Sequence, residues 1–581
     1  MVDQIDSTAW RKRAEWDGPE APRRLFDTLV GNSGMAGGVL GDAFVYRGIN
    51  LLRLFEGTWI TLIWPQWFQE LAILDDRASR TTKTALTAEF ARTRIRVAKC
   101  VVARHPGVKI EFQSSVSAAR WSWPPLRDSR LARPLSMLKA AAQIRWRRTT
   151  APAAEAADLA FFPWSAKIAP AILPVASALV AERRMSVCIA GWESSPSFDL
   201  DTVWQWDTPV RVRSPRILME AWRAAGELRR RWIALCRDGR LDLLGQWRGW
   251  DLRPLLLPFL DATVNHLSSL IANILTAEEW CKRRRLKGIV VPQDGGESVR
   301  SLIAGARLAR VRSFSVQYGY AMDNPEISEP CEDLTFLNGE STKRWFLERG
   351  ASPNKLIVVG STAYDRMAQL RLQRTRLRLE LAQQYNLDPR LPWVVVATWF
   401  VQSVYSKTTK EAELALIMEA AAALPHVQLL LKLHPSDKER GKAEAAAADR
   451  FALVARIVEN IAENEPLLCA ADALVCNYTT LAIMAIVAQT PVLIVDLGGI
   501  QQAPNRAYVD EGVAEFANTT AAAEAALQLM LKQGKAAYWA TRGAARDHFI
   551  TERLCADDGQ AAGRMLEAIK ADLNCNGPLE K

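Results

Sequence analysis

The feature of this sequence that most restricts its fold is a regular alternation of short apolar runs with longer helical patterns, which begins near residue 156. The short runs are rich in β-branched and aromatic residues, which is typical of buried strands. A strand followed by a helix and then by another strand produces a parallel sheet with helices on both faces. We therefore expect strands at 158–164, 186–192, 287–292, 313–317, 333–338 and 355–360.

The alternation restarts after an arginine-rich helical pattern at 366–386. The next expected strands are 392–398, 427–433, 472–477 and 491–496. A chain of 581 residues is also too long for one core. The sequence thus predicts an α/β protein with two doubly wound, Rossmann-like domains that face each other across a cleft, preceded by a largely helical extension. The expected parts are an extension at 1–150, a first domain at 151–365, a second at 366–553 and a C-terminal tail at 554–581.

The N-terminal extension is basic and holds eight of the 21 tryptophans. In Leu51–Leu74 and Arg120–Arg148 it combines Trp with Arg, which is favoured at membrane interfaces. Two interpretations stay open. The aromatic rings pack in a helical core, or residues 51–148 make peripheral contact with the cytoplasmic face of the inner membrane.

The net charge and the cysteines of the chain limit the classes of partner and the cellular compartment that we expect for it. The chain has 74 Lys and Arg against 64 Asp and Glu, a net charge of +10, which attracts phosphate-rich molecules. Nucleic acid fits poorly, because the arginines are spread through amphipathic helices and no reader motif is recognised. Nine dispersed cysteines without a C-x-x-C pair indicate reduced thiols and no metal site. No signal peptide and no apolar run of about 20 residues are found, so we expect a cytoplasmic protein.

Polar, glycine and hydroxyl residues gather where the expected strands end. Ligands of open parallel sheets bind outside the carboxyl ends of the strands, so these residues form the candidate site. The first domain contributes Asp294 and Glu297 as catalytic candidates and Gln317, Tyr318 and Gly319 as cleft or acceptor residues. The donor-binding candidates are His434, Asn477, Thr479, Thr480, Gly360, Ser361 and Thr398, and His434 is also a catalytic candidate.

Each of the main candidates has a chemical role and a structural alternative. His434 ends a strand and can donate a hydrogen bond to a phosphate of a departing nucleotide, or it can cap the strand. Thr479 and Thr480 open a helix, where hydroxyls and N–H groups bind anions, although Thr is also a common helix cap. Asp294, followed by two glycines, and Glu297 after it can take a proton from an acceptor hydroxyl. Their alternatives are a turn residue and a helix N-terminal charge.

Taken in order, these segments resemble a known group of enzymes. The segments are QDGGES at 293–298, KLIVVGSTAYDR at 355–366, LKLHP at 431–435 and NYTT at 477–480. The ordered set resembles GT-B transferases of the capsule and teichoic-acid type, including sialyltransferase-like, Kdo-transferase-like and CDP-glycerol glycerophosphotransferase-like proteins, over about residues 285–500.

The resemblance assigns roles to several residues. It implies that Asp294 is the general base and that His434 and the Thr479–Thr480 pair hold the donor phosphate. Gly360 and Asp365 match a structural signature at the start of the interdomain connection. The chain departs from the pattern where many relatives carry an acid, a His and a Glu, namely at Gln293, Tyr318 and Met484.

The function that the resemblance implies is a metal-independent inverting glycosyltransferase in the synthesis of bacterial surface polysaccharide, such as capsule or O-antigen. The co-substrate would be a CMP-, UDP- or CDP-linked sugar, no cofactor would be tightly bound, and the acceptor would be a glycan or a lipid-linked glycan. Three alternatives remain: a CDP-polyol phosphotransferase, a sugar-nucleotide 2-epimerase on the same fold, and a non-catalytic glycan-binding or scaffold protein.

Overall fold

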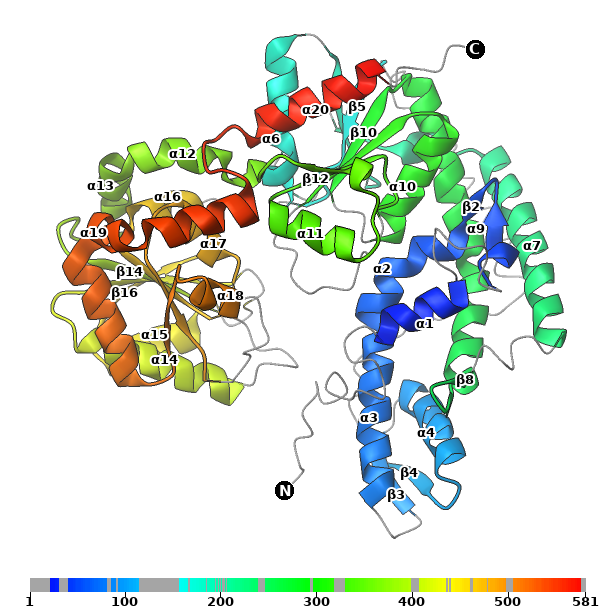
Figure 1. The fold of residues 1–581 in the computed structure, drawn as a ribbon, viewed down its shortest axis with the longest axis horizontal. Helices are drawn as coiled ribbons and strands as arrows, with labels where there is room; N and C mark the ends of the chain where they lie inside the picture. The colour runs from blue at the N-terminus through cyan, green and yellow to red at the C-terminus, as the bar shows by residue number, and fades with distance from the viewer. Residues whose placement is uncertain are drawn as a thin grey trace.

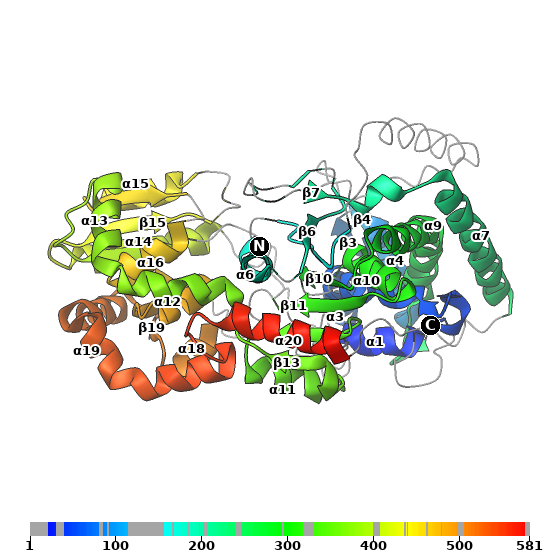
Figure 2. The same ribbon diagram turned by 90° about the horizontal axis from the view of Figure 1, so that it is seen from above.

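The computed structural model contains two parallel sheets and a helical unit that flanks the first sheet (Figure 1). It describes residues 21–575 except 31–39, 81–84, 90–91, 114–155, 166–167, 184, 194, 197, 199, 201–203, 205, 239–245, 293–295, 318–329, 399–406, 435–436, 438–439, 460–462, 478 and 498–504. Seen from above, the second sheet and its helices lie at one end of an elongated molecule, and the helical unit lies at the other (Figure 2).

The first sheet has seven parallel strands in the order β13-β12-β11-β10-β5-β6-β7. Its strands are β5 (Leu159–Phe161), β6 (Val187–Ala190), β7 (Trp206–Asp207), β10 (Gly288–Pro292), β11 (Arg312–Val316), β12 (Leu334–Leu337) and β13 (Leu356–Val358). Its neighbouring helices are α6 (Ala169–Glu182), α10 (Glu297–Leu308) and α11 (Glu340–Glu348). The strand order reverses between β5 and β10, so a topological switch point lies there.

The second sheet has six parallel strands in the order β16-β15-β14-β17-β18-β19, with its switch point between β14 and β17. Its strands are β14 (Trp393–Ala397), β15 (Gln428–Lys432), β16 (Val454–Val458), β17 (Ala473–Cys476), β18 (Val492–Val495) and β19 (Glu515–Ala517). Its helices are α12 (Asp365–Leu372), α13 (Arg374–Tyr385), α14 (Lys407–Ala422), α15 (Lys442–Arg450), α16 (Asn464–Ala470), α17 (Leu481–Val487), α18 (Asn505–Asp510) and α19 (Thr520–Leu554).

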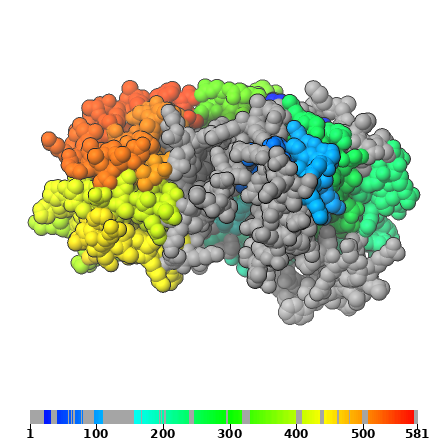
Figure 3. All heavy atoms as spheres, turned by 90° about the horizontal axis from the view of Figure 1, so that it is seen from below, coloured from blue at the N-terminus to red at the C-terminus, as the bar shows by residue number. Residues whose placement is uncertain are grey.

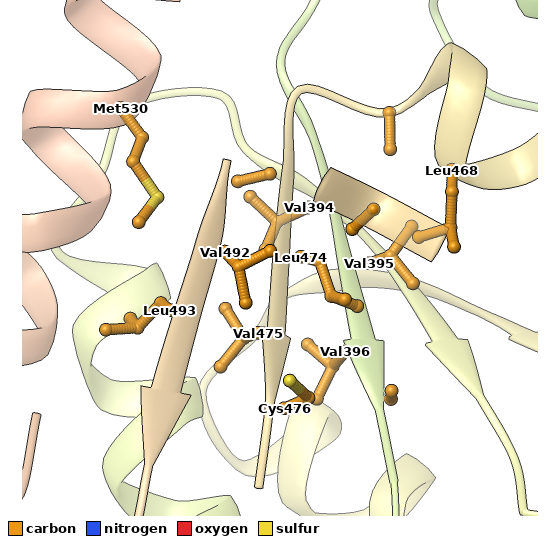
Figure 4. Close-up of a cluster of buried hydrophobic side chains, with 14 of the residues drawn as sticks. Val394, Val395, Val396, Leu468, Leu474, Val475, Cys476, Val492, Leu493 and Met530 are labelled. Carbon is orange, nitrogen blue, oxygen red and sulfur yellow. The ribbon is translucent and has the colours of Figure 1, made fainter. Parts of the chain in front are cut away.

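The central strands of the second sheet are apolar throughout because helices cover both faces. Val394, Val395 and Val396 of β14 are fully buried and pack beside Leu474 and Val475 of β17 (Figure 4). The expected fold class, an α/β protein with two doubly wound sheets, is confirmed. Within the two parallel sheets, sequence reasoning missed three of the described strands, β7, β16 and β19. Each is short or only partly buried at a sheet edge, and β16 even carries an Arg, so the apolar signal is weak there.

The helical unit has its own core, and that core is not confined to the N-terminal extension. Buried side chains of α1 (Ala21–Val30), α3 (Trp64–Arg80) and α4 (Arg92–Arg104) pack with those of α7 (Pro215–Arg237) and α9 (Arg253–Arg284). The last two helices lie between β7 and β10 in the chain. The boundary that we expected at residue 150 therefore does not separate the core of the extension from the residues that follow it. The unit also carries the strand pairs β1 (Val45–Tyr46) with β2 (Ile49–Asn50), β3 (Ala85–Glu89) with β4 (Lys109–Gln113), and β8 (Gln246–Trp247) with β9 (Trp250–Asp251).

The described aromatic residues of Leu51–Leu74 belong to this core. Trp59 and Trp64 are fully buried and Trp67 is 7% exposed, and the ring of Trp59 meets the ring of Phe259 edge to face at 4.9 Å. These rings are not available to a membrane surface, so for them the packing interpretation holds. The second Trp-rich stretch, Arg120–Arg148, lies outside the described residues.

One described helix, α9, is long and apolar enough by length and composition to cross a membrane, but more than half of its most apolar window is buried inside the protein. It packs against α7, α10 and α4, so it is the central helix of the helical unit.

The last helix corrects the expectation of a C-terminal tail. Helix α20 (Ala561–Cys575) returns from the second sheet to the first, where Met565, Leu566 and Ile569 are buried against α6 (Figure 1). The carboxylate of Asp365, at the start of α12, accepts hydrogen bonds from the N–H groups of Ala561 and Ala562 at 3.0 and 2.8 Å. Asp365 thereby caps α20 and joins the two chain crossings between the sheets.

Candidate functional site

The switch point of the second sheet gathers most of the predicted donor-binding residues. Ala397 at the end of β14 is paired with Lys432 of β15 on one side and with Cys476 of β17 on the other. Neighbouring strands lie about 4.8 Å apart, and the residues that follow each strand therefore meet at one edge of the sheet. The structure brings together at this edge Thr398, His434, Asn477, Thr479 and Thr480.

The threonines and the histidine at this edge differ in their burial and in the hydrogen bonds that they already form within the protein. Thr398 is buried, and both its N–H and its hydroxyl reach the carbonyl of Lys432, at 2.9 and 3.4 Å. The hydroxyl of Thr479 accepts a hydrogen bond from the N–H of Leu481 at 3.2 Å, while Thr480 is exposed. His434 is half-buried, and its carbonyl accepts from the N–H of Asp437 at 2.9 Å.

Helix α17, which follows the two threonines, has only seven residues. A helix this short has a weak macrodipole, so an anion here would be held mainly by hydroxyl and N–H groups. Met484, one of the predicted departures from the transferase pattern, lies on this helix and is packed in part against the core of the second unit.

A buried glutamate that sequence reasoning missed organises the same edge. Glu413 of α14 is fully buried, and both of its oxygens accept hydrogen bonds from Nδ2 of Asn477 at 3.0 Å. One of them also accepts from the N–H of Leu497, just beyond β18, at 2.8 Å. Glu413 thus fixes the amide of Asn477 after β17 and the backbone of Leu497 after β18. Its signal in the sequence was an acid among the apolar positions of the 407–422 helical pattern, spaced one turn from Lys410.

Two buried lysines add positive charge near these strand ends. Nζ of Lys410 on α14 lies 2.7 Å from the carboxylate of Glu444 on α15, and both side chains are buried. Nζ of Lys432 donates to the carbonyls of Leu433 and Glu459 at 3.2 and 3.4 Å, and burial lowers the pKa of its amine. Charged groups this deeply buried are uncommon unless they are paired or functional.

Replacing Glu413 with Ala should lower the free energy of unfolding by about 2–4 kcal/mol, because the amide of Asn477 and the N–H of Leu497 would each lose a buried acceptor. Urea unfolding of the variant measures this. Glu419→Ala is the matched control, since Glu419 lies on the same helix, is exposed and accepts a hydrogen bond from the hydroxyl of Thr520. Equal losses in the two variants would contradict the role of Glu413.

At the switch point of the first sheet, the structure describes one of the two predicted catalytic carboxylates. Asp294 lies outside the described residues. Glu297 is the first residue of α10, directly after the 293–295 segment. Its side chain keeps solvent access, and burial by the surrounding protein raises its pKa above the ordinary value for Glu. A carboxylate with a raised pKa is a stronger base, which suits proton abstraction from a hydroxyl.

Helix α10 is held in place by a buried ion-pair network with the helical unit. Nη1 of Arg300 lies 2.9 Å from Glu56 and also donates to the carbonyl of Arg53 at 2.6 Å. Arg23 of α1 contacts the other oxygen of Glu56 at 3.2 Å. The side chains of Arg300 and Glu56 are each 2% exposed. Because Arg300 lies one turn after Glu297, the network fixes the position of that carboxylate relative to the sheet.

Gln317, predicted as a cleft or acceptor residue, ties two strand ends together. Its carbonyl oxygen accepts from the N–H of Asn338 at 2.9 Å, and its amide donates to the hydroxyl of Thr342 at 3.4 Å. The side chain is 3% exposed, so in this structure it braces β11 and β12. Tyr318 and Gly319 lie outside the described residues.

Gly360 and Ser361, predicted as donor-binding residues, follow the edge strand β13 of the first sheet instead. Gly360 has φ +91°, and a Cβ at this position would lie 3.0 Å from the carbonyl oxygen of Leu554 and from the guanidinium of Arg564. Only glycine fits this conformation and this close approach. Both residues therefore lie where the chain crosses between the two sheets, and their donor-binding role stays a prediction. Among the described residues, no group of three His, Cys, Asp or Glu side chains could hold a metal ion.

Comparison with known proteins gives similarities of fold only. No protein-family model and no curated protein matches the chain. Among solved structures, the wall teichoic acid polymerase TagF is 9% identical, with a TM-score of 0.46, over 77% of this chain and 97% of its own. The UDP-GlcNAc 2-epimerase from Neisseria meningitidis, bound to UDP-GlcNAc, is 12% identical, with a TM-score of 0.44, over 71% and 99%. A glycosyltransferase from Rickettsia africae is 12% identical, with a TM-score of 0.43, over 72% and 98%.

Proposed function

We propose that this protein is a metal-independent inverting glycosyltransferase that uses a nucleotide-activated sugar in the synthesis of a bacterial surface polysaccharide. The observation that carries the proposal is the concentration of polar and charged side chains at the carboxyl edge of the second sheet, at its switch point. There, buried Glu413 holds Asn477 beside Thr398 and Thr479. Ligands of doubly wound sheets bind at such switch points.

In the proposed mechanism, the nucleotide donor binds at the second sheet. His434 and the hydroxyls of Thr479 and Thr480 donate hydrogen bonds to the phosphate oxygens and stabilise the negative charge of the departing nucleotide. The acceptor binds at the switch point of the first sheet, where Asp294 or Glu297 takes the proton from the attacking hydroxyl. A single displacement of this kind inverts the anomeric carbon. The donor is a CMP-, UDP- or CDP-linked sugar, and the acceptor is a glycan or lipid-linked glycan.

The first test is thermal stabilisation by CMP, CDP, UDP, GDP and their sugar or polyol conjugates. We expect a saturable shift with one nucleotide class, since a ligand at 100 times its Kd adds about 2.7 kcal/mol of stability. For a unit of this size that is a rise in Tm of about 5–10 °C. His434→Ala should abolish most of the shift. His548→Ala is the control, because this exposed His lies on α19 and not in a segment that follows a strand, and its loss should leave the shift unchanged.

The outcomes separate the candidate functions. No shift of the wild-type protein with any nucleotide would contradict the transferase and would leave a glycan-binding or scaffold protein. A shift with CDP-glycerol or CDP-ribitol alone, with release of CMP, would identify a phosphopolyol transferase. Conversion of UDP-GlcNAc to its 2-epimer without any acceptor would identify an epimerase.

We also propose that the protein works in the cytoplasm, at the cytoplasmic face of the inner membrane, where lipid-linked acceptors are found.

A further inference from the structure

Helix α7 carries large apolar side chains on its outward, solvent-exposed face as well as on its buried face. Its buried residues, such as Ala221, Leu228 and Trp232, pack against the helical unit. Three large apolar side chains point to the solvent instead. The exposed fractions are 50% for Met219, 57% for Trp222 and 41% for Ile233. A solvent-facing helix surface ordinarily carries charged and polar residues at such positions.

The exposed apolar residues share one face of the helix with arginines. Residues spaced three, four or seven apart lie on the same side of an α-helix. Counted in this way, Met219 and Trp222 are aligned with Arg223, Arg230, Ile233 and Arg237. The buried residues lie on the opposite side. At about 1.5 Å per residue, this outward face runs for roughly 27 Å from Met219 to Arg237.

The charge of the helix is strongly positive. Its 23 residues include six arginines, all exposed, and only two acids. Both acids are engaged at the side of the face. Glu220 accepts a hydrogen bond from the hydroxyl of Tyr46 at 3.1 Å, and Glu227 forms an ion pair with Arg231 at 2.6 Å. The arginines that flank Met219, Trp222 and Ile233 therefore have no acid between them on this face.

The position of α7 suits contact with a large flat surface. The helix lies along the outer edge of the molecule, at the end opposite the second sheet, in both ribbon views (Figures 1 and 2). From below, the residues of the second unit fill one end of the molecule, and the green residues that include α7 lie at the other (Figure 3). A partner surface at α7 would therefore leave the strand ends of the second sheet open.

We propose that the outward face of α7 is a membrane-binding surface that lies on an anionic lipid bilayer. Trp, Met and Ile enter the boundary between headgroups and acyl chains, while the arginines pair with lipid phosphates. This places the membrane contact on α7 rather than on the Trp-rich stretch Leu51–Leu74, whose described rings are buried. The surface is argued from α7 alone and does not depend on the proposed enzyme activity.

The test is flotation of the full-length protein with vesicles of phosphatidylglycerol and phosphatidylcholine, compared with vesicles of phosphatidylcholine alone. The protein should float with the anionic vesicles at about 0.1 M salt and largely dissociate at about 1 M, where the Debye length falls from about 10 to about 3 Å. The triple variant Met219→Ser/Trp222→Ser/Ile233→Ser should reduce the partition coefficient by about tenfold or more. Arg223→Gln/Arg230→Gln/Arg237→Gln should do the same.

Two matched control variants distinguish the effect of this face on vesicle binding from the effect of removing apolar or positive side chains elsewhere on the surface. Leu372→Ser/Leu379→Ser removes leucines of α12 and α13 that are 89% and 56% exposed. Lys442→Gln/Lys532→Gln/Arg376→Gln removes three exposed cations of the second unit. Both control variants should bind like the wild type, and all variants should keep its Tm. The proposal is overturned if the wild-type protein stays with the soluble fraction, if neutral vesicles bind it equally well, or if the α7 variants instead dissociate a dimer without changing vesicle binding.

Discussion

Replacing Asp294 with Asn should lower the rate of sugar transfer by about 100- to 10,000-fold, the range that a general base ordinarily contributes. Asn keeps the size of the side chain and can still hydrogen-bond the acceptor hydroxyl, but it cannot accept its proton. Donor binding should be unchanged, because the proposed donor-binding residues follow strands of the second sheet. The measurement is donor turnover, with the sugar nucleotide that the stabilisation panel selects, together with the thermal shift for the same nucleotide.

Glu297→Gln is the comparison that decides between the two carboxylates. If Glu297 is the base, the large loss of transfer rate should be seen in Glu297→Gln instead of Asp294→Asn. The acid limb of kcat/KM in the wild type should then lie above the ordinary Glu pKa of about 4.3, because burial raises the pKa of Glu297. Wild-type turnover in both Asp294→Asn and Glu297→Gln would contradict the assignment of a base to this switch point.

Replacing Arg300 with Met should lower the free energy of unfolding by about 3–5 kcal/mol, because it removes the closest positive partner of a fully buried Glu56. Urea unfolding at pH 7 measures the loss. Arg307→Met is the matched control: this exposed Arg lies on the same helix and donates to the carbonyl of Cys331, so its loss should cost about 1 kcal/mol or less. Glu56→Gln should cost less in the Arg300→Met background than in the wild type, since the two groups are coupled.

The stability gained from Glu56 should depend on pH in a defined direction. Burial pushes the pKa of Glu56 up, but the charges of Arg300, Arg23 and Arg53 outweigh it, so the folded-state pKa lies below the ordinary value. A lowered pKa means that the contribution is complete above the unfolded-state value of about 4.3 and is lost as the pH falls through the folded-state value. The difference between wild type and Arg300→Met should therefore be constant from pH 8 to about pH 5 and shrink below about pH 4. An unchanged difference at pH 3 would contradict this.

The sequence by itself determined the two sheets of this protein. Runs such as 393–397 and 473–476 are apolar along their whole length, which is typical of a strand that is buried on both faces. The alternation with helices then leaves little choice but parallel, doubly wound sheets. It also determined which residues follow each strand, and so placed Thr398, His434 and Asn477 at one edge before any contact was known.

Tertiary structure alone decided what those residues do. The same pattern that put Gly360 after a strand could not show that Leu554 and Arg564 fill the space beside it, since these contacts join residues about two hundred positions apart. Nor could periodicity show that Glu413 reaches Asn477, or that Arg300 reaches Glu56 in another unit. Partners of buried charges are chosen by packing in three dimensions. For the same reason, the sequence left open whether the tryptophans of Leu51–Leu74 pack in a core or contact a membrane. Only the structure showed that Trp59, Trp64 and Trp67 are buried, whereas Trp222 of α7 is exposed.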